Sequence, residues 1–128
     1  METVIEAKDL VKSYQMGNTT MDVLKHVNVN IHKGEFVSIM GPSGSGKSTL
    51  LYLIGGLDKP TSGSIRIQGK ELAHMKDRQG SIMRRRDVGF IFQFYNLIPN
   101  LNVEENIMLP ILLDGKKLRN YRERLQSI

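Results

Sequence analysis

Apolar and polar residues alternate along the first quarter of the chain, and this period of two predicts strands with one buried face. Residues 4–12 alternate in part, and residues 23–31 carry valine or isoleucine at four odd positions with polar residues largely between them. The sequence Gly-Asn-Thr-Thr at residues 17–20 separates the two stretches and is typical of a turn. We therefore expect two strands that pair across this turn.

Two later stretches, residues 36–40 and 87–92, are short and mainly apolar, with β-branched and aromatic members. Such runs are typical of strands that are buried on both faces of a parallel sheet. Because these strands need neighbours at both edges, two of them predict only part of a sheet. The other elements expected here are a Gly/Ser loop over residues 41–47, a helix over 48–54 that Gly55 ends, turns over 33–35, 60–63 and 69–70, a strand over 64–68, and a basic helix over 77–85.

The last part of the chain is predicted to be helical. Asn102 is followed three residues later by Glu105, which is the spacing of a capping box, so we expect a helix over residues 103–113. The preceding residues 93–100 lack a periodic pattern and predict a loop. Apolar residues then recur at helical spacing from Leu118 to Ile128, with no Gly, Pro or cap after them. This pattern is expected of a helix that continues beyond Ile128.

The composition excludes several classes of protein. The chain has 128 residues, 40% hydrophobic and 24% charged, which is the size of one domain and the composition of an ordinary globular protein. It has no cysteine, so disulfide scaffolds and zinc–thiolate sites are excluded. No apolar run approaches the ~18 residues that cross a bilayer, and the acidic residues after Met1 do not fit a signal peptide. We therefore expect a cytosolic chain. Its net charge of +5 permits an anionic ligand without identifying one.

The strongest chemical signal is the sequence GPSGSGKST from Gly41 to Thr49, which matches the phosphate-binding pattern G-x-x-x-x-G-K-[ST] in full. Small residues let a loop wrap its N–H groups around phosphate oxygens, and the helix that follows adds its positive end. Lys47 supplies a charge for the β- and γ-phosphates, and Ser48 a hydroxyl for Mg²⁺. A chance Gly/Ser linker would lack the apolar stretches on both sides. The nucleotide-binding residues predicted from the motif are Gly41, Pro42, Ser43, Gly44, Ser45, Gly46, Lys47, Ser48 and Thr49.

The chain as a whole resembles the ATP-binding subunits of ABC transporters. The sequences LDKPTSG at residues 57–63 and VGFIFQ at 88–93 carry this resemblance together with residues 35–38 and the Gly/Ser loop. The sequence FYNLIP at residues 94–99, followed by VEENI, is similar to one branch of the family, which contains the macrolide-exporter, lipoprotein-release and bacitracin-type peptide-resistance ATPases.

The resemblance covers residues 3–128 and implies an α/β fold, the N-terminal portion of an ABC-type P-loop NTPase domain. We expect an antiparallel β subdomain, part of a parallel core sheet and the start of a helical arm, in a domain that is incomplete within these 128 residues. The ATP-binding core and β subdomain are expected over about residues 1–93, and the Q-loop with the start of the helical subdomain over about 94–128.

The resemblance also implies roles for single residues. Tyr14 matches the aromatic residue that stacks on adenine, although by itself it is simply a half-buried tyrosine at a strand end. Gln93 matches the Q-loop glutamine, which reaches Mg²⁺ and the attacking water, so it joins Lys47 as a candidate catalytic residue. Residues 93–99 lie where the family contacts its membrane permease, and the alternative is a small apolar plug under a helical lid.

Three features of the family are not found in the sequence: the signature loop Leu-Ser-Gly-Gly-Gln, a Walker B strand ending in Asp-Glu, and the switch histidine. The sequence ILLD at residues 111–114 imitates a Walker B ending, but Pro110 disfavours a central strand and Gly115 stands where the glutamate belongs. His26, His32 and His74 lie too early to be the switch residue. We therefore expect this segment to bind MgATP without hydrolysing it.

For the complete protein, the resemblance implies ATP hydrolysis that drives export of a peptide, lipoprotein or drug-like substrate through a separate permease. It also implies a head-to-tail dimer with a second nucleotide-binding subunit, on the inner face of the membrane.

The alternatives to this function are another P-loop NTPase, such as a GTPase or kinase, and a non-catalytic subunit that binds nucleotide or the permease. A GTPase needs Asn-Lys-x-Asp, and no Asn here precedes Lys. The sequence has two cationic clusters, at residues 84–86 and 116–124, which are expected to be solvated helix faces, with no nucleic-acid partner.

Overall fold

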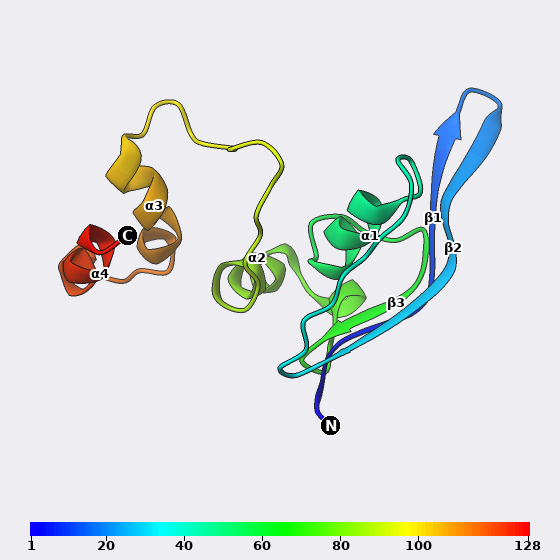
Figure 1. The fold of residues 1–128 in the computed structure, drawn as a ribbon, viewed down its shortest axis with the longest axis horizontal. Coiled ribbons are helices and arrows are strands. Elements are labelled where there is room, and N and C mark those ends of the chain that lie inside the picture. The colour runs from blue at the N-terminus through cyan, green and yellow to red at the C-terminus, as the bar shows by residue number, and fades with distance from the viewer. The chain divides into compact units, whose positions relative to one another are not determined.

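The computed structural model describes residues 1–128, which form two compact units, Met1–Gly80 and Ser81–Ile128. The first unit contains the strands and one helix of the phosphate-binding motif, and the second is helical (Figure 1). Each unit is described by itself below. None of the helices combines the length and the apolar character needed to cross a membrane.

A four-stranded antiparallel sheet organises the first unit. Its strands are β1 (Thr3–Met16), β2 (Thr19–His32), β3 (Ser62–Ile67) and β4 (Lys70–Glu71), in the spatial order β2-β1-β3-β4. The long hairpin of β1 and β2 turns at Gly17 and Asn18, so the expected pairing of these two strands is confirmed. The predicted strand over residues 64–68 is confirmed as β3, which begins two residues earlier and ends one residue earlier than predicted.

The partial alternation of β1 has a structural cause. Asp9 and His26 both have positive φ, 53° and 51°, where the register of the β1–β2 pair shifts. These shifts are β-bulges, each of which inserts one unpaired residue into a strand. The first bulge, in β1, lets Ala7 and Leu10 both be buried although they lie three positions apart. The second bulge, in β2, leaves Leu24 buried in place of its odd-numbered neighbours and pairs it with Lys12.

Helix α1 (Lys47–Ile54) supplies the other side of the core and packs against β2 and β3. The helix begins one residue before the predicted start and ends at Gly55 as expected. Apolar residues at positions 50, 53 and 54 are buried because they share the helix face that covers the sheet. The buried apolar side chains of this unit are Ala7, Leu10, Leu24, Leu50, Leu53, Ile54, Ile65 and Ile67.

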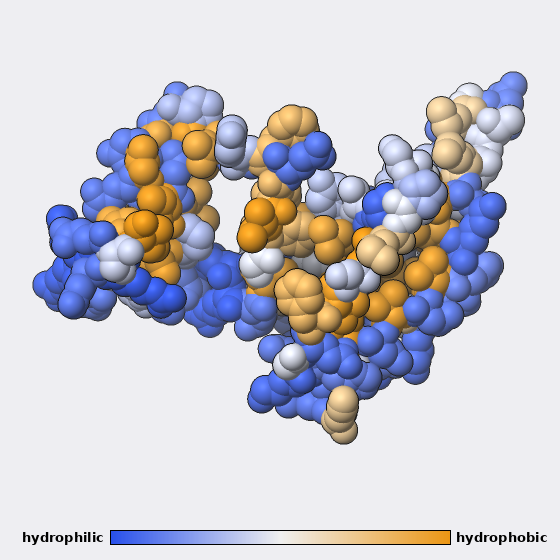
Figure 2. Space-filling view, viewed as in Figure 1, coloured by the Kyte–Doolittle hydropathy of each residue, from blue (hydrophilic) through white to orange (hydrophobic).

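The two segments predicted as buried parallel strands are not strands. Residues 36–40 and 87–92 have no strand partner, and Phe36 and Ile91 are 97% and 96% exposed. An apolar, β-branched segment becomes a strand only where neighbours complete its hydrogen bonds, and no other segment of the 128 residues pairs with either one. Figure 2 shows apolar residues, in orange, at the surface as a consequence.

Two predicted turns are misplaced by one or two residues. Ser62 and Gly63, expected in a turn over residues 60–63, already belong to β3. The turn before β4 is formed by Gln68 and Gly69 rather than by residues 69–70, and Gln68 has a φ of 50°. A 3₁₀ turn, η1 (Leu72–His74), follows β4 and precedes α2 (Asp77–Arg86), which confirms the predicted basic helix.

The second unit contains α3 (Val103–Leu113), with the predicted bounds and the predicted capping box. Asn102 Oδ1 accepts from the N–H of Glu105 at 2.8 Å, and the Glu105 carboxylate accepts from the N–H of Asn102 at 3.1 Å. The single helix expected from Leu118 onward is instead a 3₁₀ turn, η2 (Leu118–Asn120), and a short helix, α4 (Arg122–Gln126), with a break at Tyr121.

Candidate functional site

The predicted phosphate-binding loop lies directly before α1. The N–H of Ser45 donates to the carbonyl of Pro42 at 3.2 Å, which closes a turn around Gly44. Gly44 and Gly46 have φ values of 79° and 94°, a region that side chains with a Cβ disfavour. Gly46 is also the N-cap residue of α1, so the loop reaches the helix through a left-handed residue. Gly44 and Gly46 therefore lie where the bend of the loop requires glycine.

This loop borders a hollow of 280 Å³. Its lining combines the start of α1 with the end of the loop and one residue of β2, and consists of Val23, Ser43, Gly44, Gly46, Lys47, Ser48 and Thr49. Six of the nine residues predicted from the motif thus meet around one space. Gly41, Pro42 and Ser45 do not line it, and neither does Tyr14.

The N-terminus of α1 presents free donors beside this hollow. No side chain caps the helix, because Gly46 has none, and the first turn contains no acidic residue. The first N–H groups of a helix have no acceptor within it and carry the positive end of the helix dipole. The site therefore favours an anion with several closely spaced oxygens, such as a polyphosphate.

Lys47 is folded back onto the loop. Its Nζ donates to the carbonyl of Gly41 at 2.6 Å and to that of Pro42 at 2.8 Å, and lies 3.5 Å from the hydroxyl of Ser45. Carbonyl dipoles hold the ammonium more weakly than phosphate oxygens would. A bound polyphosphate would thus compete with the loop carbonyls for this cation, and Ser48, exposed on the first turn, offers the oxygen that a phosphate-bound Mg²⁺ needs.

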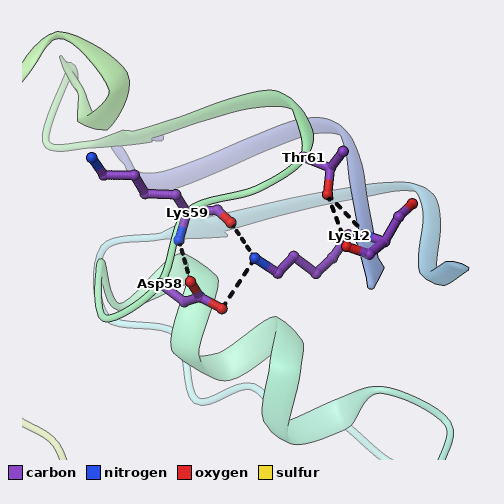
Figure 3. Close-up of polar contacts among 5 residues, drawn as sticks. Lys12, Asp58, Lys59 and Thr61 are labelled. Carbon is purple, nitrogen blue, oxygen red and sulfur yellow. Dashed lines mark hydrogen bonds and ion pairs between the residues drawn. The ribbon is translucent and has the colours of Figure 1, made fainter. Parts of the chain in front are cut away.

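Tyr14 lies near the far end of β1 and is 43% exposed. The Nζ of Lys12 stands over its ring, 5.2 Å from the centroid. Figure 3 shows Lys12 reaching the segment after α1, where Nζ donates to the carbonyl of Lys59 at 2.7 Å and pairs with Asp58 at 3.3 Å. Sequence reasoning missed Lys12, although its spacing of two from Tyr14 places both on the same face of the strand.

Gln93 belongs to the second unit, at an exposed bend, so the hollow is formed by the first unit alone. The residues that follow Gln93 are exposed, Phe94 by 75% and Leu97 by 66%, rather than packed as an apolar plug. Asn106 of α3 fixes the end of this segment, because its side chain accepts from the N–H of Ile98 at 2.8 Å and donates to the carbonyl of Ile98 at 3.3 Å.

Asp114 is the end of the sequence that imitates a Walker B strand. Residues 111–113 form the last turn of α3, and Asp114 is its C-cap residue, so the segment is helical as predicted and is not a Walker B strand. Its carboxylate accepts from Nε of Arg86 at 2.7 Å and from Nε of Arg85 at 3.0 Å. These hydrogen bonds, that of Arg86 first, lower the pKa of Asp114 although burial opposes them. The carboxylate thus has a structural role.

Known proteins resemble this chain over nearly its whole length. It is 44% identical to the ABC transporter ATP-binding protein YknY of Bacillus subtilis, over 96% of the chain and 54% of the relative. It is 43% identical to the lipoprotein-releasing system ATP-binding protein LolD of Geobacter metallireducens, over 91% and 52%. The chain therefore spans about half the length of these relatives.

A solved structure has the same fold. The dimeric ATP-binding cassette MJ0796, in a post-hydrolysis state bound to ADP and Pi, matches with a TM-score of 0.88 and 44% identity, over 96% of this chain and 54% of that one. This match confirms the expected fold class of an ABC-type P-loop NTPase portion. The family model described as ABC transporter matches residues 24–128, which include the phosphate-binding loop, α1 and α3. The chain belongs to the ABC transporter family, as part of its ATP-binding domain.

Proposed function

We propose that the loop from Gly41 to Thr49 binds the phosphates of MgATP. The observation that carries the proposal is the hollow at the uncapped start of α1, bordered by left-handed glycines and by Lys47. Backbone N–H groups and the Lys47 ammonium would bind the phosphates, and the Ser48 hydroxyl would be a ligand of Mg²⁺. Mg²⁺ supplies positive charge that neutralises the phosphates when it is bound.

Two further residues take part in this proposal. Tyr14 would stack on adenine, and its exposure on β1 is what such a contact requires. Gln93 would act near the metal and the attacking water, together with Lys47. The 128 residues are proposed to bind MgATP, about residues 1–93 as the core and 94–128 as the beginning of the helical subdomain.

For the complete protein we propose hydrolysis of ATP, coupled to export through a separate membrane permease. The exported substrate is proposed to be a peptide, a lipoprotein or a drug-like molecule, and the similarity to a protein named for lipoprotein release supports this range. The exposed apolar residues between Gln93 and Pro99 would contact the permease, at the inner face of the membrane. A second nucleotide-binding subunit would join head to tail, since the related cassette MJ0796 is dimeric.

Thermal unfolding with and without nucleotide tests the binding step. A ligand at ten times its Kd stabilises the native state by about 1.4 kcal/mol, which raises the Tm by several degrees. We expect this rise with MgATP for the wild type and for the control Lys33→Ala, whose side chain lies at an exposed turn. Lys47→Ala should abolish it. A larger rise with MgGTP than with MgATP would favour another P-loop NTPase, and an equal rise in Lys47→Ala would contradict the assignment of the loop.

A further inference from the structure

Lys12 is held more firmly than a surface lysine. Its side chain is only 14% exposed, although it lies on β1 and carries a charge. The ammonium has three neighbours, the carboxylate of Asp58, the carbonyl of Lys59 and the ring of Tyr14. The three contacts differ in kind: a hydrogen bond to the carbonyl at 2.7 Å, an ion pair with the carboxylate at 3.3 Å, and a cation–π contact 5.2 Å from the ring centroid.

The backbone on both sides of Lys12 is fixed to the same segment. The N–H of Thr61 donates to the carbonyl of Val11 at 2.8 Å, and the N–H of Ser13 donates to the hydroxyl of Thr61 at 2.9 Å. The segment after α1 therefore lies along β1 and anchors Lys12 from both its backbone and its charged end. Most exposed ion pairs are weak because forming them costs the entropy of a mobile side chain. The side chain of Lys12 is already fixed by its surroundings, so its contacts do not depend on the ion pair alone.

The consequence concerns the ring of Tyr14. A cation over an aromatic face within about 6 Å is attracted to the π electrons and occupies that face. An adenine base that stacks on Tyr14 must then use the opposite face. The cation also draws π density away from the ring, which reduces the repulsion between the ring and a stacked base.

We propose that Lys12 is a positioning residue for the base of the nucleotide: it fixes the ring of Tyr14 from one face and leaves the other face for adenine. The inference rests on the proposed function of the phosphate-binding loop. It also gives the segment from Asp58 to Thr61 a role, because this segment fixes Lys12. Lys12 itself does not touch the nucleotide and acts through Tyr14.

The test measures the contribution of the base to binding separately from that of the phosphates. Calorimetric titration of the whole chain with MgATP and with magnesium tripolyphosphate, which has no base, compares the two parts of the ligand. We expect Lys12→Met to weaken MgATP binding by about fivefold, the size of a partly desolvated cation–π contact, and to leave tripolyphosphate binding unchanged. Lys8→Met on the same strand, where the lysine pairs with Glu6 in solvent, is the matched control and should change neither.

Two more variants distinguish positioning from mere stability. Lys12→Arg keeps the cation and should bind MgATP with the affinity of the wild type. Lys12→Gln removes the cation but keeps a polar side chain, so it replaces the methionine variant if that variant folds poorly. We expect Lys12→Gln to weaken MgATP binding about fivefold as well. In a Tyr14→Leu background, Lys12→Met should have no further effect on MgATP. The inference is overturned if Lys12→Met and Lys12→Gln leave MgATP affinity unchanged, if they weaken both ligands equally, or if Lys12→Met weakens MgATP equally with and without Tyr14. Failure of both ligands to bind the wild type would overturn the proposed function as well.

Discussion

Gly46 lies so close to Val23 that a Cβ on the glycine would stand 3.1 Å from the carbonyl oxygen of Val23 and 3.2 Å from its Cγ1. This contact joins the phosphate-binding loop to β2 across the wall of the hollow. Gly44, in the same loop, has a similar positive φ but open space at the corresponding position. The two glycines therefore separate the effect of backbone conformation from that of close packing.

We predict that Gly46→Ala destabilises the chain more than Gly44→Ala. Both variants place a Cβ in the left-handed region, at a cost of about 1 kcal/mol, and only Gly46→Ala also displaces β2, which adds roughly another 1–2 kcal/mol. Urea unfolding measures the difference as a lower midpoint for Gly46→Ala. Equal midpoints for the two variants would show that the loop moves away from Val23 without cost.

The capping box of α3 leads to a second prediction. Asn102→Ala removes the acceptor of the Glu105 N–H and leaves the start of the helix without its cap. We expect a loss of about 1 kcal/mol in the free energy of unfolding, typical of an N-cap asparagine. Asn100→Ala, in the turn two residues earlier, is the control and should unfold like the wild type in the same urea titration. A loss of similar size in the control would contradict the role given to the cap.

The capping box also illustrates which parts of the fold can be predicted from sequence. Helix α3 depends on contacts between residues three or four apart, and its bounds were predicted correctly. The hairpin was predicted for the same reason, since a turn brings its strands together. Residues 36–40 and 87–92 were predicted incorrectly, because a strand without a local partner depends on segments that periodicity does not reveal.

The candidate site likewise contains features that the local sequence predicts and features that depend on tertiary contacts. The motif predicted a bent loop of small residues directly before a helix, and the structure has this loop, with Gly44 and Gly46 at positive φ, because these properties belong to nine consecutive residues. The hydrogen bonds from Lys47 to the loop carbonyls were not predicted. The contact of Lys12 with residues 58–59 joins positions 46 or more apart, and its contact with Tyr14 depends on that anchorage. The contribution of Val23 to the hollow also follows from tertiary packing.

A third prediction concerns Asn106, which ties the exposed apolar segment to α3. Its side-chain amide also donates to the carbonyls of Leu101 at 3.1 Å and Asn102 at 2.9 Å. Asn106→Leu should therefore accelerate hydrogen exchange of the Ile98 amide by roughly five- to tenfold, the factor expected for a hydrogen bond that contributes about 1 kcal/mol.

Two comparisons make this measurement specific. Asn106→Asp keeps an acceptor for the Ile98 N–H and should retain most of the protection of that amide. The N–H of Asp114, bonded to Pro110 at the other end of α3, reports on the helix as a whole. If both amides exchange faster in Asn106→Leu, the side chain stabilises the helix in general rather than the segment before it.

The last prediction follows from the lowered pKa of Asp114. The hydrogen bond from Arg86, with that from Arg85, favours the ionised carboxylate, so the folded chain binds its proton less tightly than the unfolded chain does. The stabilisation is therefore fully present above the ordinary pKa of aspartate, about 3.9, and is lost as the pH falls through the lowered pKa of the folded state.

Asp114→Asn should lower the free energy of unfolding at pH 7, and the difference from wild type should shrink as the pH approaches and passes below that ordinary value. Urea midpoints measured from pH 7 down to pH 3 give this profile, with Asp87→Asn, an exposed carboxylate after α2, as the control. A difference between wild type and Asp114→Asn that stays constant over this range would mean that the two arginines do not act on the charge of Asp114.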